Sequence, residues 1–201
     1  MLEQRIQQHF IDSADLKYQA GPLMGKPVSQ AVLALLTCVT SGGKVLACGD
    51  GVSGLLATQF AAHFIGRFER ERPGLGAIAL PIDDIDAFSG SAQETGRERF
   101  ARPVRALGQA GDVLLAISAS GRSATVLAAI EAAHEREMTV IALLGNNGGT
   151  VAGVLRETDV LVSVPHERAT RVHELHLLVL HCLCDGVDCL LLGEQEDEIV
   201  G

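Results

Sequence analysis

Short, almost continuously apolar runs alternate along the chain with longer segments in which apolar residues recur at helical spacing. The apolar runs occupy residues 44–48, 76–80, 112–118, 138–144 and 159–164. Strands that are apolar on both faces are typical of a parallel sheet covered by helices on each side. Helical spacing marks residues 55–65 and 124–135. The pattern therefore predicts a single doubly wound α/β domain, with a five-stranded parallel sheet flanked by helices.

Helices are also predicted at both ends of the chain. Apolar residues recur at helical spacing over residues 2–18, and Pro27 is expected to open a second helix. A long helix over residues 170–192 closes the domain, and its apolar side chains are distributed almost all around it. A helix with this distribution is buried on most sides. We therefore expect the terminal helices to pack in an oligomer.

The length of 201 residues suits one domain. We divide it into N-terminal helices (1–42), an α/β core with the closing helix (43–192) and an acidic tail (193–201). The first residues lack the basic start and the apolar run of a signal peptide. No uninterrupted apolar stretch reaches the ~20 residues that a membrane helix needs, so we expect no membrane segment. The five cysteines, an odd number, favour reduced thiols in the cytoplasm over a disulfide framework.

Charge and composition narrow the choice of partners. The net charge is −9 at pH 7, which argues against a surface that binds nucleic acid through its phosphates. Aromatic residues make up only 3% of the chain and tryptophan is absent, so sites that stack bases or sugars are disfavoured. Binding to another protein that itself contacts DNA stays open.

Two turns rich in glycine and serine follow predicted strands. One is Cys-Gly-Asp-Gly-Val-Ser-Gly at residues 48–54, and the other is Ser-Ala-Ser-Gly-Arg-Ser at residues 118–123. In open α/β sheets, ligands bind where strands end and where helix N-termini supply free N–H groups. Neither turn has the Walker A pattern or the full dinucleotide-binding fingerprint. Together they predict a cradle for a phosphate group, to which Arg122 could add a charged contact.

The same two turns carry a family resemblance. Residues 117–123 resemble the Ser-Thr-Ser-Gly-Asn-Ser motif of SIS (sugar isomerase) domains, and residues 48–53 resemble their Gly-Asn-Gly-Gly-Ser loop. The likeness covers almost the whole chain. The subgroup that it resembles contains phosphoheptose isomerase (GmhA) and DiaA, which binds the replication initiator DnaA. The resemblance implies a cytoplasmic homotetramer that holds a sugar phosphate through four serines: Ser53, Ser118, Ser120 and Ser123.

By the same resemblance, the positions that carry chemistry differ from those of the family. The first metal-ligand His of the family falls on Gln59, and the base Glu falls on His63. The ligand Gln falls on His173, whereas His181 keeps the family identity. Phosphoheptose isomerase chemistry needs a base, an acid and usually a nearby zinc ion. The departures therefore fall on the groups that the reaction depends on.

The histidines at these positions allow three interpretations. His63, His173 and His181 could form a rebuilt zinc site. Since His173 and His181 lie about 12 Å apart along one helix, a zinc site shared between subunits is easier, and His176 could substitute for either. His63 could instead act as a metal-free base, with His181 as the acid, because imidazole titrates near neutral pH. Otherwise these are hydrogen-bonded histidines at an interface or in a degenerate pocket.

Two further departures concern the pocket itself. Asp50 replaces the Asn of the family's phosphate loop, and residues 89–97 do not match the family's Ile-Gly-Asn-Asp region. A carboxylate beside a bound phosphate is a like-charge cost unless it is turned away or neutralised.

Two functions stay open: an isomerase that resembles phosphoheptose isomerase, and a non-catalytic, DiaA-like tetrameric scaffold that binds DnaA.

Overall fold

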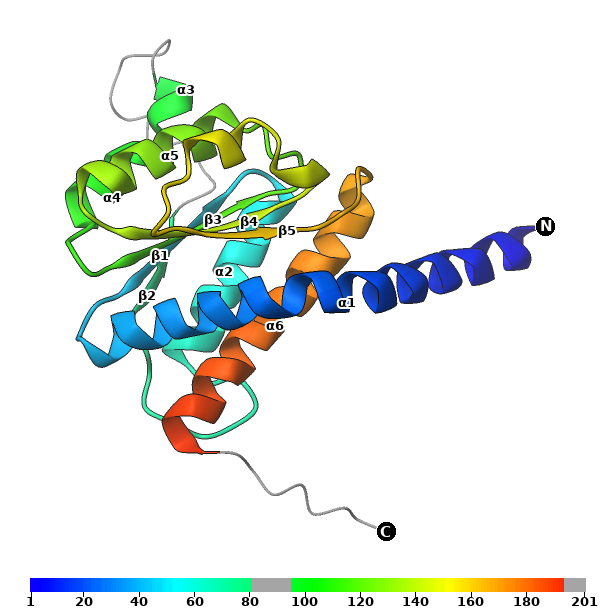
Figure 1. Cartoon of the computed structure of the whole chain (residues 1–201), viewed down its shortest axis with the longest axis horizontal. Coiled ribbons are helices and arrows are strands. Elements are labelled where there is room, and N and C mark those ends of the chain that lie inside the picture. The colour runs from blue at the N-terminus through cyan, green and yellow to red at the C-terminus, as the bar shows by residue number, and fades with distance from the viewer. Residues whose placement is uncertain (81–94, 194–201) are drawn as a thin grey trace.

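A parallel sheet of five strands forms the centre of the fold, in the order β2-β1-β3-β4-β5 (Figure 1). The structure is a computed structural model, and it describes residues 1–80 and 95–193. The strands are β1 (Val45–Gly49), β2 (Ala77–Ala79), β3 (Val113–Ser118), β4 (Thr139–Leu144) and β5 (Val160–Ser163). Each strand overlaps an apolar run of the sequence, so the predicted doubly wound sheet is confirmed.

Helices cover both faces of this sheet (Figure 1). One face carries the first, second and last helices: α1 (Leu2–Thr40), α2 (Val52–Ile65) and α6 (Ala169–Leu192). The other face carries α4 (Ala101–Leu107) and α5 (Ala124–Glu135), with the short α3 (Thr95–Glu98) against α5. Short 3₁₀ helices follow β4 at Asn146–Gly148 and Val151–Val154. Because both faces are covered, β1 and β3 are buried along their whole lengths.

The register of β1 against β3 places the two glycine- and serine-rich turns side by side. Gly49, the last residue of β1, pairs with Ile117 of β3. A Cβ at Gly49 would lie 2.8 Å from the carbonyl oxygen of Ile117 and 2.7 Å from the Cβ of Ser53. Only glycine therefore lets α2 begin this close to the end of β3. The close approach brings the N-termini of α2 and α5 to the same edge of the sheet.

The prediction of two N-terminal helices is wrong, because α1 continues through both Pro22 and Pro27. Proline inside a helix removes one backbone hydrogen bond and crowds the preceding turn, which is why the sequence indicated a break. Contacts distant in sequence hold the part of α1 before the prolines against α6. The guanidinium of Arg171 donates to the His9 carbonyl at 2.9 Å, and the Ser13 hydroxyl donates to Glu174 at 2.6 Å.

Two helices, α1 and α6, are long and apolar enough to cross a membrane by length and composition. The two helices pass a test that allows charged residues within the window, so the expectation of no membrane segment stays a prediction. The criterion is also met by core helices of soluble proteins, and α1 and α6 pack against each other and on the sheet.

Residues 81–94 lie outside the described residues, and they include most of the stretch 89–97 that does not match the family's Ile-Gly-Asn-Asp region. Residues 194–201 of the predicted tail also lie outside the described residues.

Candidate functional site

A cavity of about 200 Å³ lies at the edge of the sheet where β1 and β3 end. All four predicted phosphate-binding serines line it, together with Asp50 and His173. Ser53 is in the first turn of α2, Ser118 ends β3 and Ser123 is the N-cap of α5. In the described part of the chain, the Ser53 and Ser118 hydroxyls have no hydrogen-bond partner, so both can donate to a ligand.

A close crossing of two loops fixes the turn that carries Ser120 and Ser123. Gly121 has φ +62°, and a Cβ there would lie 2.5 Å from the carbonyl oxygen of Gly148. A Cβ at Gly149 would in turn lie 2.4 Å from the Gly121 carbonyl oxygen, which accepts a hydrogen bond from the Val151 N–H at 2.9 Å. Both positions require glycine, since a side chain would force the loops apart. The loop after β4 thus supports the predicted phosphate turn.

Asp50 is turned toward the first turn of α5. Its Oδ2 accepts hydrogen bonds from the Thr125 hydroxyl at 2.6 Å and from the Ser123 hydroxyl. Its Oδ1 lies 3.8 Å from Nη2 of Arg99. The carboxylate is therefore both hydrogen-bonded and paired with a cation, while it still lines the cavity. The sequence did not point to Thr125 or Arg99, because only the folded chain brings them to Asp50.

His63 and His181 meet at a second place, between α2 and α6. The side-chain Nε2 of Gln59 lies 3.5 Å from Nε2 of each imidazole, and the ring centroids of the two histidines are 6.0 Å apart. Gln59 and His63 share one face of α2, since they are four residues apart. The Phe68 ring contacts both imidazoles, at centroid distances of 5.2 and 5.5 Å. The structure thus brings together the two residues predicted to act as base and acid.

His173 belongs to the serine cavity instead of this histidine pair. In residues 1–80 and 95–193, no three His, Cys, Asp or Glu side chains are grouped closely enough to hold a metal ion. The predicted set of His63, His173 and His181 is therefore not assembled within one chain. At the histidine pair, only the two imidazoles belong to the His, Cys, Asp and Glu side chains that usually bind zinc, which is fewer than the three or four protein ligands of a typical site.

His176 lies one turn beyond His173 on α6 and is completely buried. The two ring centroids are 6.4 Å apart, and neither nitrogen of His176 has a hydrogen-bond partner of normal geometry in the described residues. Burial is the main reason that the pKa of His176 is lowered to about 4. His176 is therefore a neutral core residue, and not the exposed substitute ligand that the sequence allowed.

This burial makes stability depend on pH. The pKa of His176 is about 4 in the folded chain, compared with about 6.5 in an unfolded one. Because the unfolded chain takes up the proton first, stability from this residue is complete above pH 6.5 and falls as pH drops toward 4. From His176 alone we expect a loss of about 2 kcal/mol of stability between pH 7 and pH 5 in urea unfolding, and we expect His176→Leu to remove that share of the pH dependence. An unchanged pH dependence in the variant would contradict this origin.

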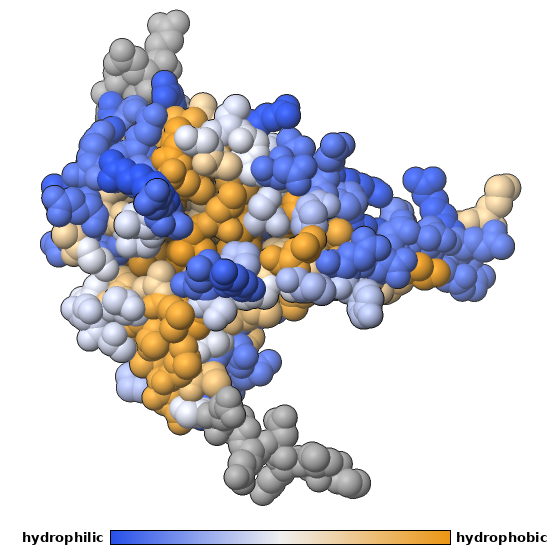
Figure 2. Space-filling view, viewed as in Figure 1, coloured by the Kyte–Doolittle hydropathy of each residue, from blue (hydrophilic) through white to orange (hydrophobic). Residues whose placement is uncertain are grey.

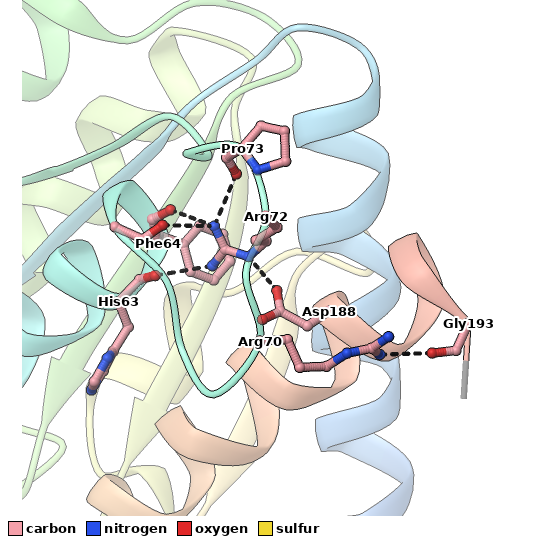
Figure 3. Close-up of polar contacts among 8 residues, drawn as sticks. His63, Phe64, Arg70, Arg72, Pro73, Asp188 and Gly193 are labelled. Atoms are coloured by element: carbon pink, nitrogen blue, oxygen red, sulfur yellow. Dashed lines mark hydrogen bonds and ion pairs between the residues drawn. The ribbon is translucent and has the colours of Figure 1, made fainter. Parts of the chain in front are cut away.

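A buried ion pair holds the last turn of α2 against α6 (Figure 3). The side chains of Arg72 and Asp188 are only 1% and 2% exposed, and Nε of Arg72 donates to Oδ1 of Asp188. The same guanidinium donates to the carbonyl oxygens of His63 at 2.9 Å and of Phe64 at 2.8 Å. Figure 3 shows the imidazole of His63 directed away from this cluster. The pair thus fixes the backbone that carries His63 without contacting its ring.

Comparison with known proteins gives one consistent family. The SIS domain matches residues 12–145. The chain is 57% identical to a phosphoheptose isomerase of Methylibium petroleiphilum over 98% of each chain, and 50% identical to that of Azoarcus sp. over 96% of this chain and 98% of the relative. It is similar to the solved structure of phosphoheptose isomerase GmhA from Neisseria gonorrhoeae, with 43% identity, a TM-score of 0.85, and 94% and 99% of the two chains covered.

A second solved structure, a phosphoheptose isomerase from Francisella tularensis, has 38% identity and a TM-score of 0.87, with 94% of this chain and 98% of the other covered. The two relatives and the two solved structures each cover 94% or more of the chain. The family resemblance that the two turns carry is confirmed. The chain belongs to the SIS domain family.

Proposed function

We propose that the protein is a phosphosugar isomerase that converts sedoheptulose 7-phosphate, as a ketose, into the aldose heptose 7-phosphate. Relatives named phosphoheptose isomerase support this assignment at 57% and 50% identity over nearly the whole chain. The observation that carries the proposal is the cavity formed by Ser53, Ser118, Ser120 and Ser123 at the N-termini of α2 and α5. Hydroxyls and N–H groups at helix N-termini suit a phosphate group.

In this proposal the histidine pair moves the proton. An aldose–ketose interconversion removes a proton from the carbon beside the carbonyl and delivers a proton to the carbonyl oxygen. His63 takes the proton from carbon, and His181 donates to the oxygen. Their facing positions on α2 and α6, with ring centroids 6.0 Å apart, support a shared task. Gln59 lies between them and can orient one imidazole relative to the other.

A zinc ion would be held by His63 and His181 only with a third ligand from outside the chain, such as the equivalent of His173 from a second copy. An ion held there would polarise the substrate carbonyl. We assign no step to zinc, because residues 1–80 and 95–193 of one chain do not bring a full ligand set together.

A proton NMR time course of sedoheptulose 7-phosphate in deuterated buffer tests the reaction. The protein is measured as purified, with added zinc and with a chelator. Deuterium at the carbon beside the carbonyl, or a new aldose signal, would support the isomerase. Activity that survives the chelator would favour the histidine mechanism, and dependence on zinc would favour a metal site.

A second candidate function is a non-catalytic, DiaA-like scaffold in the cytoplasm that binds DnaA. The resemblance supports it, because it implies that Gln59 and His63 stand at the positions of the family's metal-ligand His and base Glu. A folded protein with no exchange under any of the three NMR conditions would support the scaffold. A direct binding measurement with purified DnaA would then decide whether DnaA is its partner.

We also propose that the protein assembles as a homotetramer through α1 and α6. Large apolar side chains of α1 are exposed in the single chain, including Phe10 at 75% and Tyr18 at 87%. An apolar groove of about 140 Å³ runs between α1 and α6, lined by Met24 and Leu175 among others. Figure 2 shows further apolar surface at the C-terminal end of α6, where Leu190 is exposed. Exposed apolar surface of this kind is typical of an interface.

Light scattering measures the assembly directly. We expect a mass four times the chain mass of 21.2 kDa, and Phe10→Glu is expected to lower it, because a charge would enter the apolar contact. The exposed Glu157→Gln, in the turn before β5, is the control and should leave the mass unchanged. A monomeric mass for the unaltered chain would contradict the tetramer.

A further inference from the structure

We infer that Asp50 is a specificity-determining residue of the serine cavity, because its carboxylate competes with a ligand phosphate for the N-terminus of α5. The inference rests on the proposed function, in which this cavity receives the phosphate of a phosphosugar. The negative charge of Asp50 makes the cavity bind a dianion more weakly than its serines alone would allow, so the cavity discriminates against a dianion.

The first support is that the hydroxyl protons of Ser123 and Thr125 are already used in hydrogen bonds within the chain. Oδ2 of Asp50 receives hydrogen bonds from the hydroxyls of Ser123 and Thr125, which themselves lie 2.7 Å apart. A hydroxyl has one proton to donate. Both protons are therefore used within this trio, and the Ser123 oxygen also accepts from the Val126 N–H at 3.1 Å. Ser123 lines the cavity but has no proton left for a ligand oxygen.

The second support is the position of the negative charge. The N-terminus of a helix carries a partial positive charge that stabilises an anion. Asp50 already lies against this end of α5, through Ser123 as the N-cap and through Thr125 in the first turn. A phosphate entering the cavity would share the same partial charge with a carboxylate that lines the same space.

The third support is the lack of a cation among the side chains that line the cavity in the described residues. The serines are uncharged, and burial lowers the pKa of His173, so that its imidazole is neutral at pH 7. The guanidinium of Arg99 is paired with Asp50 at 3.8 Å, so each offsets the charge of the other. The lining thus offers hydrogen bonds from Ser53, Ser118 and Ser120 but no net positive charge to balance a dianion.

The test is the affinity of Asp50→Asn for two ligands of equal shape and different charge. Asparagine has the same size, its carbonyl oxygen can accept from Ser123 and Thr125, and its amide can donate to the ligand. Calorimetry at pH 8 compares sedoheptulose 7-phosphate, a dianion, with the matching 7-sulfate, a monoanion. We expect Kd to fall about tenfold for the phosphate and about threefold for the sulfate, since Coulomb energy scales with charge.

The control variant is Glu157→Gln, which removes the same charge at the opposite edge of the sheet, before β5 begins. It should leave both Kd values unchanged. Asp50→Ala provides a second removal of the charge, and melting curves without ligand establish that each variant is folded. A gain in affinity that is larger for the phosphate than for the sulfate, in either Asp50 variant, would support the inference.

Two results would overturn it while leaving the proposed function in place. One is measurable phosphosugar binding by the unaltered protein with no gain in either Asp50 variant. The other is an equal gain for phosphate and sulfate, which would indicate a steric effect instead of charge. Absence of phosphosugar binding by the unaltered chain and by both variants would overturn the inference and the proposed function together.

Discussion

Arg72→Ala is expected to lower the free energy of unfolding by about 3–5 kcal/mol, because it leaves the buried carboxylate of Asp188 without its partner. Oδ2 of Asp188 already has no hydrogen-bond partner in the described residues, so Arg72 is the main compensation for this charge. The carbonyls of His63 and Phe64 also lose the Arg72 donor, although the Phe64 carbonyl keeps the N–H of Leu75 at 2.9 Å. Urea unfolding monitored by circular dichroism measures the loss.

A double variant separates the charge from the other contacts of Arg72. Asp188→Leu with Arg72→Met removes both charges, and we expect it to be more stable than Arg72→Ala alone. The matched control is Arg67→Ala, since Arg67 pairs with Glu71 at the surface, where the two side chains are 60% and 80% exposed. Exposed ion pairs contribute little to stability, so we expect no measurable change in the free energy of unfolding of Arg67→Ala. Equal losses in Arg72→Ala and Arg67→Ala would contradict the importance of burial.

His63→Ala is expected to reduce the rate of isomerisation about 100- to 10,000-fold, the usual contribution of a positioned base. Because His63 does not line the serine cavity, the affinity for the sugar phosphate should stay the same, so that kcat falls and KM does not. Single-turnover NMR of sedoheptulose 7-phosphate in deuterated buffer measures the rate of proton removal.

The control for this variant is Thr58→Ala on the same helix. Thr58 is exposed, and its hydroxyl only returns to the Gly54 carbonyl, so its loss should leave the rate unchanged. Light scattering should give the same mass for His63→Ala, His181→Ala and the unaltered chain. A variant that dissociates to monomers would show that the histidine is structural, and an unaltered rate in His63→Ala would exclude it as the base.

The sequence predicted the sheet well because its strands are buried on both faces. Residues of β3 alternate between two cores, with Leu115 against α1, α2 and α6 and Leu114 against α4 and α5, so both must be apolar. The result is a continuous apolar run that differs from the helical periodicity around it. The two glycine- and serine-rich turns could be placed for a related reason, since strand ends of a parallel sheet share one edge. The choice of the four serines within them came from the family resemblance.

Other features depend on contacts between distant residues, which periodicity does not encode. Pro22 and Pro27 favoured a break in α1, but contacts with Arg171 and Glu174 hold the helix in place. Arg72 and Asp188 are 116 residues apart, and nothing in either local sequence indicates that both are buried. The sequence shows that an aspartate at position 50 is unusual for the family's phosphate loop. It does not indicate that this carboxylate accepts hydrogen bonds from two hydroxyl groups.

The packing of α1 along α6 has a consequence for the order in which the chain folds. These helices are the first and last elements of the described chain, and Arg171 and Glu174 of α6 hold the N-terminal part of α1. During synthesis, the buried side of α1 leaves the ribosome long before its partner exists. The apolar side of α1 therefore has to be shielded, or its packing delayed, until translation ends. Early termination within α6 would leave an aggregation-prone nascent chain.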